Sequence, residues 1–178
     1  MMTAEVTRNF WHAPEMVWRV IGRFDAFDWA AGIGPLLMEA GRPRDQVGAI
    51  RAFRYYGVPV RQRLTARCVE TPSYTYECLG PFRGLRHCEA SLAAAARADG
   101  GATVTWRAEF QILQSFTARP FRGIGARATR PVPGGEPEQN SAFDLATNPY
   151  EYWAAFLRAE FGKSLERVET ILDMSLSG

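Results

Sequence analysis

The chain has 178 residues, of which 47% are hydrophobic and 12% aromatic, and its formal net charge is +2. This composition is typical of a globular protein, and we expect residues 1–178 to form one domain with a substantial core. A general nucleic-acid binder usually carries a stronger basic excess, so no nucleic-acid partner is expected.

Signals for export, membrane insertion and metal binding are missing from the sequence. Residues 1–13 lack a charged segment followed by an apolar one, and no stretch approaches the roughly 18–20 apolar residues that span a bilayer. Cys68, Cys78 and Cys88 show no CxxC spacing. We therefore expect a reduced, cytoplasmic protein without a transmembrane segment or a metal site.

The chain begins with a predicted strand and a short helix. Residues 3–13 are rich in β-branched and aromatic side chains and predict a strand. Pro14 suits the first turn of a helix, and the spacing of the apolar residues that follow predicts an amphipathic helix over 14–24. A loop containing Trp29 comes next.

Six strand-like runs separated by turn signals occupy the middle of the chain. They cover 35–41, 47–55, 58–69, 73–79, 86–97 and 102–114. No helical pattern interrupts them, which indicates an antiparallel meander and not βαβ units.

The C-terminal segment predicts one long helix. Asn148 is a suitable N-cap, Pro149 suits the first helical position, and Glu151 completes a capping box. An apolar stripe then continues for nearly thirty residues, roughly 40 Å of helix, which must lie across the whole sheet. Its members are Trp153, Phe156, Leu157, Phe161, Leu165, Val168, Ile171 and Leu172.

Residues 115–147 lack periodicity and carry four arginines before the loop-like sequence PVPGGEPEQNS. Structureless segments longer than about 12–15 residues are usually functional lids or disordered. Three alternatives stay open for this segment: a lid over an anionic ligand, a contact to a partner, or a solvated loop.

Several short motifs follow the order of these elements: PEMVW (14–18), RFDAFDW (23–29), VGAIRAF (47–53), VRQRL (60–64), YTYEC (74–78) and ATVTWRAEF (102–110). Together with the order of the elements, they resemble the SRPBCC helix-grip superfamily, which includes polyketide cyclases, START-related lipid carriers and birch-pollen-allergen-like proteins. The resemblance implies an α+β fold, in which a curved antiparallel sheet of about seven strands wraps around the C-terminal helix and leaves a cavity. It does not imply one reaction, because this fold hosts carriers, receptors and cyclases.

A two-residue turn at Tyr56-Gly57 would fix which side chains face that cavity. Tyr55 would oppose Val58, and Arg51 would oppose Gln62. Alternation then makes one face of this hairpin concave, with Ala49, Arg51, Phe53, Tyr55, Val58, Val60, Gln62 and Leu64, and the other solvated, with Arg54, Arg61, Arg63 and Arg67. The same alternation turns inward Tyr74, Tyr76, Cys78, Cys88, Ala90, Leu92, Val104, Trp106, Ala108 and Phe110.

Arg51 is the most unusual member of this face. Proteins that resemble this one often carry an acid where Gln62 stands, so the usual cross-strand ion pair is missing, and a buried guanidinium needs another partner. Arg51 could hold a ligand carboxylate or stabilise a developing enolate. Alternatively, it reaches Glu109 or another acid, or extends to solvent.

Three functions are compatible with this pattern. The first is a cyclase or dehydratase that folds a polyketide-like or aromatic precursor, with Arg51, Tyr55, Tyr74 and Tyr76 polarising its carbonyls. The second is a non-catalytic carrier or sensor of a lipid or hydrophobic metabolite. The third is an interaction protein whose cavity is filled by side chains.

In the first two functions the partner is an apolar or aromatic small molecule, and a homodimer is left open. The predicted ligand-binding residues are Trp29, Phe53, Gln62, Trp106, Phe110, Trp153, Phe156 and Leu157. The sequence has no P-loop, dinucleotide fingerprint or nucleophile elbow, so no cofactor is expected.

Overall fold

The computed structural model describes residues 1–41, 44–82, 84–112 and 149–176. These residues form, in chain order, β1 (Met2–Phe10), α1 (Pro14–Ile21), β2 (Leu37–Met38), β3 (Ile50–Tyr55), β4 (Val58–Cys68), β5 (Ser73–Cys78), β6 (Leu85–Ala96), β7 (Ala102–Ile112) and α2 (Pro149–Leu176). The predicted helix-grip architecture is confirmed. The predicted lid at 115–147 and the predicted cap Asn148 lie outside the described residues.

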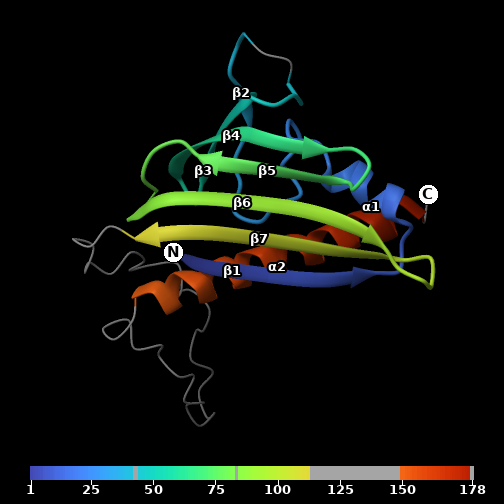
Figure 1. Cartoon of the computed structure of the whole chain (residues 1–178). Coiled ribbons are helices and arrows are strands. Elements are labelled where there is room, and N and C mark those ends of the chain that lie inside the picture. Colours follow the sequence, from blue (N-terminus) through green and yellow to red (C-terminus); the bar gives the residue numbers. More distant parts are fainter. Residues whose placement is uncertain (42–43, 83, 113–148, 177–178) are drawn as a thin grey trace, which may run out of the picture.

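The strands form one antiparallel sheet in the order β1-β7-β6-β5-β4-β3-β2 (Figure 1). Strands β2 to β7 make the expected meander, and β1 joins its far edge by pairing with β7 over the whole length of β1. The first strand of the chain therefore lies beside the last strand.

Two elements at the edges are shorter than the sequence patterns predict. In place of 35–41, β2 contains only Leu37 and Met38, and the Leu37 side chain is exposed, so no burial favours a longer strand here. The first strand ends at Phe10 and not at residue 13, because Phe10 pairs with Ala102, the first residue of β7, and no partner lies beyond it.

The β3–β4 hairpin follows the predicted register. Tyr56 and Gly57 both have positive φ, 44° and 80°, as a two-residue type I′ turn requires. Tyr55 pairs with Val58 and Arg51 pairs with Gln62.

The prediction that Arg67 lies on the solvated face of β4 is wrong. A β-bulge between Leu64 and Ala66 shifts the alternation, so Arg67 pairs with the buried Tyr74. The Arg67 guanidinium donates to the backbone carbonyl of Gly22 (2.7 Å) and to the carboxylate of Asp45 (2.7 Å). Arg67 thus ties β4 to the end of α1.

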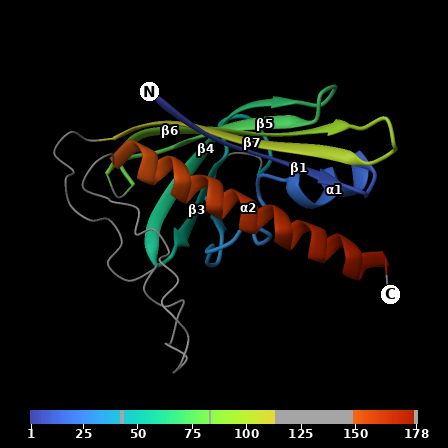
Figure 2. The same cartoon turned by 90° about the horizontal axis from the view of Figure 1, so that it is seen from below.

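The long helix α2 lies diagonally across the concave face of the sheet, as Figure 2 shows. At 28 residues it is about 42 Å long. Six side chains of its predicted stripe are buried: Trp153, Leu157, Phe161, Leu165, Val168 and Leu172. Neither helix in the described part of the chain combines the length and apolar character that a membrane span requires.

Packing of α2 against the sheet should dominate the stability of the fold. Leu165 is fully buried, so Leu165→Ala should lower the free energy of unfolding by about 2–5 kcal/mol through lost contacts and a residual cavity. Leu176→Ala is the matched control on the same helix; Leu176 is 65% exposed, and its loss should cost less than about 0.5 kcal/mol. Urea unfolding followed by circular dichroism measures both, and equal losses would contradict the observed packing.

Candidate functional site

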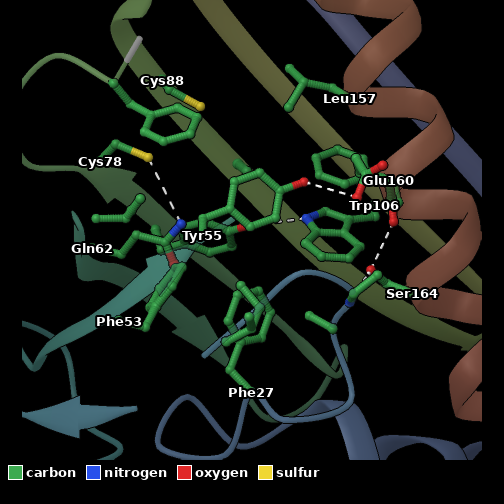
Figure 3. Close-up of a pocket in the computed structure, with 18 of the residues that line it drawn as sticks. Phe27, Phe53, Tyr55, Gln62, Cys78, Cys88, Trp106, Leu157, Glu160 and Ser164 are labelled. Atoms are coloured by element: carbon green, nitrogen blue, oxygen red, sulfur yellow. Dashed lines mark hydrogen bonds between the residues drawn. The ribbon is translucent and has the colours of Figure 1, made fainter. Parts of the chain in front are cut away.

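A cavity of about 80 Å³ lies between the concave face of the sheet and α2 (Figure 3). Six of its lining side chains are alanine, cysteine or serine, and seven are aromatic. The lining residues are Phe27, Ala30, Ala31, Ile33, Phe53, Tyr55, Val60, Gln62, Tyr76, Cys78, Phe82, Leu85, Cys88, Ala90, Trp106, Leu157, Glu160, Phe161 and Ser164.

The helix contributes a buried carboxylate to this mostly apolar wall. Glu160 is only 5% exposed. Its Oε2 accepts hydrogen bonds from the hydroxyls of Tyr55 (3.1 Å) and Tyr56 (2.7 Å), and its Oε1 accepts one from the ammonium of Lys163 (2.8 Å). The carboxylate therefore connects α2 to the β3–β4 turn.

Ser164, one helical turn further along α2, fixes the loop that follows α1. Its hydroxyl donates to the backbone carbonyl of Glu160 (2.7 Å) and accepts from the backbone N–H of Ala31 (2.9 Å). Two polar residues on one face of α2 thus hold both the hairpin turn and the loop at the edge of the cavity.

Burial and the Glu160 carboxylate keep the two tyrosines protonated. Burial raises the pKa of Tyr55 well above its usual value, and the nearby carboxylate adds to this effect. Burial and the hydrogen bond to Glu160 raise the pKa of Tyr56 to about 12. Both hydroxyls are therefore hydrogen-bond donors at neutral pH, as any tyrosine is, and stay protonated at more alkaline pH than an exposed tyrosine does.

The rings of Tyr76 and Trp106 from the sheet and of Phe161 from α2 form an aromatic part of the cavity wall. The indole N–H of Trp106 donates to the hydroxyl of Tyr76 (3.0 Å). Trp106 also stacks on Phe161 of α2, with ring centroids 4.0 Å apart and planes 7° from parallel. These contacts fix the Trp106 ring against the cavity.

Arg51 lies behind the cavity wall and is fully buried. Its Nε donates to Oε1 of Gln62 (2.8 Å) and its Nη1 to the backbone carbonyl of Phe24 (3.2 Å). The guanidinium carbon lies 4.2 Å from the centroid of the Phe24 ring and 3.6 Å from that of Phe27. Cation–π attraction therefore replaces part of the hydration that Arg51 loses.

Neither alternative contact expected for Arg51 is present. The carboxylate of Glu109 binds Arg107 (2.7 Å), and Arg51 does not reach solvent. Within the described ranges, Arg51 makes no ion pair, and its Nη2 and the Tyr74 hydroxyl, which interact electrostatically with each other, have no other hydrogen-bond partner. Burial lowers the pKa of Arg51 and raises that of Tyr74, although the charge of Arg51 opposes the latter shift.

The predicted site residues divide into two groups. Those at the cavity wall are Tyr55, Tyr76, Phe53, Gln62, Trp106 and Leu157; those outside the wall are Arg51, Tyr74, Trp29, Phe110, Trp153 and Phe156. Trp29, for example, packs behind Trp106 with ring centroids 5.3 Å apart, and Trp153 packs on Phe82 with centroids 6.3 Å apart. The second group supports the wall from behind or beside it.

Sequence reasoning missed Glu160 and Ser164. Both lie on the apolar stripe of α2, since Glu160 follows Leu157 by three residues and Ser164 follows Glu160 by four. A polar residue at a stripe position of α2 is therefore the sequence signal that could have identified each of them.

Comparisons with known proteins agree with this architecture. A family model described as polyketide cyclase / dehydrase and lipid transport matches residues 1–132. No curated protein matches the chain.

Solved structures with the same fold include the protein XoxI from Bacillus cereus, with a TM-score of 0.70 and 15% identity, over 100% of this chain and 99% of that one. An uncharacterized protein from Bacillus thuringiensis has a TM-score of 0.65 and 15% identity, over 96% and 98% of the two chains. A protein from Thermobifida fusca has a TM-score of 0.56 and 24% identity, over 64% and 76%. Identities this low show the fold alone.

The hydrogen bond between Tyr56 and Glu160 predicts a pH dependence. Between pH 10 and about 12 the unfolded chain loses the Tyr56 proton and the folded chain keeps it, so folding stability should fall as pH rises through this window. In Glu160→Gln the negative charge is gone, and Tyr56 should ionise at lower pH. Ultraviolet absorbance of tyrosinate measures this change, and Tyr56→Phe identifies the step. Identical titration curves for the parent and Glu160→Gln would contradict the assignment.

Proposed function

Because the chain belongs to the polyketide cyclase/dehydrase and lipid transport family, we propose that it binds a small apolar or aromatic molecule in the cavity between the sheet and α2. The observation that carries this proposal is a mostly apolar, aromatic-lined cavity into which a few polar groups converge. Binding sites for small molecules usually have this combination, in which apolar walls provide affinity and polar groups fix orientation.

The size of the cavity limits the guest. Its volume of about 80 Å³ is roughly half that of an engineered protein cavity of about 150 Å³ that binds benzene. Pockets for larger ligands usually measure about 300–1,000 Å³. A guest with one aromatic ring therefore requires some movement of the wall.

Phe27 and Ile33 lie between the cavity and the surface. Both line the cavity and also an open depression of about 440 Å³ formed by residues 25–28 and 33–36. Phe27 is held against the Arg51 guanidinium, whereas Ile33 is only half-buried. A shift of Ile33 would join the two volumes and admit a longer molecule from the surface.

Glu160 and Tyr55 would orient the guest. A ligand hydroxyl or amine could donate to the carboxylate, and the Tyr55 hydroxyl could turn toward a ligand carbonyl. Charge-assisted hydrogen bonds of this kind are stronger than neutral ones. We therefore favour a guest that carries at least one hydrogen-bonding group on an apolar body.

The same groups favour a cyclase or dehydratase as one form of this function. In an aldol-type cyclisation the Glu160 carboxylate would remove a proton from the carbon beside a carbonyl, and the hydroxyl of Tyr55 or Tyr76 would stabilise the developing enolate oxygen. Arg51 and Tyr74 would act through Gln62 and Tyr76. A carrier or sensor would use the same cavity without the proton transfer.

Filling the cavity should abolish binding. Ala90 lines the cavity, and Ala90→Leu places an isobutyl group in it. Ser91→Leu is the matched control because it adds a leucine on the other face of the same strand. In NMR titrations with phenol and toluene, the parent and Ser91→Leu should bind both probes, and Ala90→Leu should bind neither.

The polar anchor has its own test in the same titrations. Glu160→Gln should reduce phenol affinity by about tenfold and leave toluene affinity nearly unchanged, as expected for the loss of one charge-assisted hydrogen bond. Saturable binding that persists in Ala90→Leu, or no binding of either probe to the parent protein, would overturn the proposal.

A further inference from the structure

A single row of side chains crosses four strands of the sheet beneath the cavity, β3 to β6. Arg51 on β3 pairs with Gln62 on β4, and Gln62 pairs with Cys78 on β5. The β5–β6 pairing ends with Glu77 opposite Glu89, the residues next to Cys78 and Cys88, and the two thiols hydrogen-bond to each other. Two thiols therefore face each other across neighbouring strands, and both line the cavity (Figure 3).

The buried guanidinium decides how the Gln62 amide is oriented. Because arginine has only donors, the Gln62 oxygen must face Arg51, and it accepts from Nε at 2.8 Å. The Gln62 NH₂ group then points to the other neighbour in the row and donates to Sγ of Cys78 (3.8 Å). Arg51 thus orients the Gln62 amide so that its NH₂ group donates to Sγ of Cys78, although Arg51 has no hydrogen bond to that sulfur.

These contacts make the two thiols unequal. The Cys88 thiol, which donates to Cys78, lowers the pKa of Cys78; the Gln62 donor and the Arg51 charge act in the same direction, and burial opposes them. The pKa of Cys88 is raised well above its usual value by the same contact and by burial. A thiolate is a far better nucleophile than a thiol, so Cys78 is the attacking sulfur of the pair.

We propose that Cys78 and Cys88 form a redox-active dithiol in the cavity wall, which hydroperoxides oxidise to a cross-strand disulfide. In the first step Sγ of Cys78 attacks a peroxide oxygen, the O–O bond breaks, and the leaving hydroxide takes the thiol proton to form water. Cys78 is then a sulfenic acid. In the second step Sγ of Cys88 attacks Sγ of Cys78, the S–O bond breaks, and a second water leaves with the Cys88 proton. The two thiols lose two electrons, and hydrogen peroxide is reduced to two waters.

The geometry of the sheet permits this bond. Directly opposed residues of an antiparallel pair have Cβ atoms about 4.5–5.5 Å apart, and a disulfide needs about 3.5–4.5 Å. The strands must therefore approach by about 1 Å. Cys78 is the last residue of β5, where such a shift is least restrained by pairing.

Access to the sulfur atoms also favours a small oxidant. Cys78 is half-buried and Cys88 is buried, so large disulfide reagents are excluded. The cavity holds about 80 Å³, and hydrogen peroxide is little larger than water, which occupies about 30 Å³ in the liquid. Cys68 lies outside the row and the cavity; its sulfur contacts Glu70 and Thr71 beyond the end of β4.

The test uses the full-length chain with Cys68→Ser, in which Cys78–Cys88 is the one possible intramolecular disulfide. After treatment with hydrogen peroxide and alkylation under denaturing conditions, mass spectrometry should find two unalkylated cysteines and a mass lower by about 2 Da. In Cys88→Ala the reaction should stop at a Cys78 sulfenic acid that dimedone traps. In Cys78→Ala the Cys88 thiol should remain free.

Gln62→Glu tests whether the hydrogen bonds from Arg51 through Gln62 determine how fast Cys78 is oxidised, or whether the exposure of Cys78 alone does so. The glutamate keeps a partner for Arg51 but removes the donor to Cys78 and adds a negative charge, so Cys78 oxidation should slow by about tenfold or more. Gln111→Glu, on the exposed side of β7, is the matched control and should oxidise at the parent rate.

Circular dichroism confirms that each variant is folded before oxidation, and no ligand is added, so failure to bind phenol or toluene does not affect the result. Two alkylated thiols after peroxide treatment of the folded protein would overturn the proposal, as would oxidation of Cys88 ahead of Cys78.

Discussion

The structure depends on burying the apolar stripe of α2 against the concave face of the sheet. The 28 residues of α2 cross the strands diagonally, so the concave face of the curved sheet covers the helix and no single strand does (Figure 2). This requirement also buries most residues along the stripe, including polar ones. Glu160 and Ser164 are in the interior for this reason, and their hydrogen bonds hold the surrounding loops in place.

The cavity consequently has two polar systems of opposite character. On the helix side, the Glu160 carboxylate is surrounded by donors from Tyr55, Tyr56 and Lys163. On the sheet side, the Arg51 cation is held between aromatic rings and extends its influence through Gln62 to Cys78. An apolar guest between them would experience a field across its length, because the low dielectric of the interior screens neither charge well.

Much of this arrangement could be predicted from the sequence. Strand alternation and the recognisable turn at Tyr56-Gly57 are sufficient to place Arg51, Gln62 and Tyr55 on the inner face. Side chains alternate with a period of two along a strand, and the turn fixes the register. Helical periodicity likewise identifies the buried stripe of α2. These features are local, so they can be derived without the rest of the chain.

Other features depend on contacts that no local pattern reveals. The bulge in β4 reverses the orientation of Arg67, and alternation alone could not anticipate it. Whether an inward side chain touches the cavity or lies behind it, as Arg51 does behind Phe27, depends on how the α1–β2 loop packs. The size of the cavity also depends on tertiary packing, because the cavity is the small space left between the packed side chains of the sheet and of α2.

The β3–β4 turn couples the surface of the protein to its interior. Tyr56 adopts a left-handed backbone conformation that favours glycine or asparagine, yet its side chain reaches inward to the carboxylate on α2. Any displacement of that carboxylate must therefore either break the bond to the phenol or drag the hairpin tip with it. Occupancy of the cavity would in this way change the position or the hydrogen bonding of a turn at the surface of the protein, where another macromolecule could bind without contacting the guest.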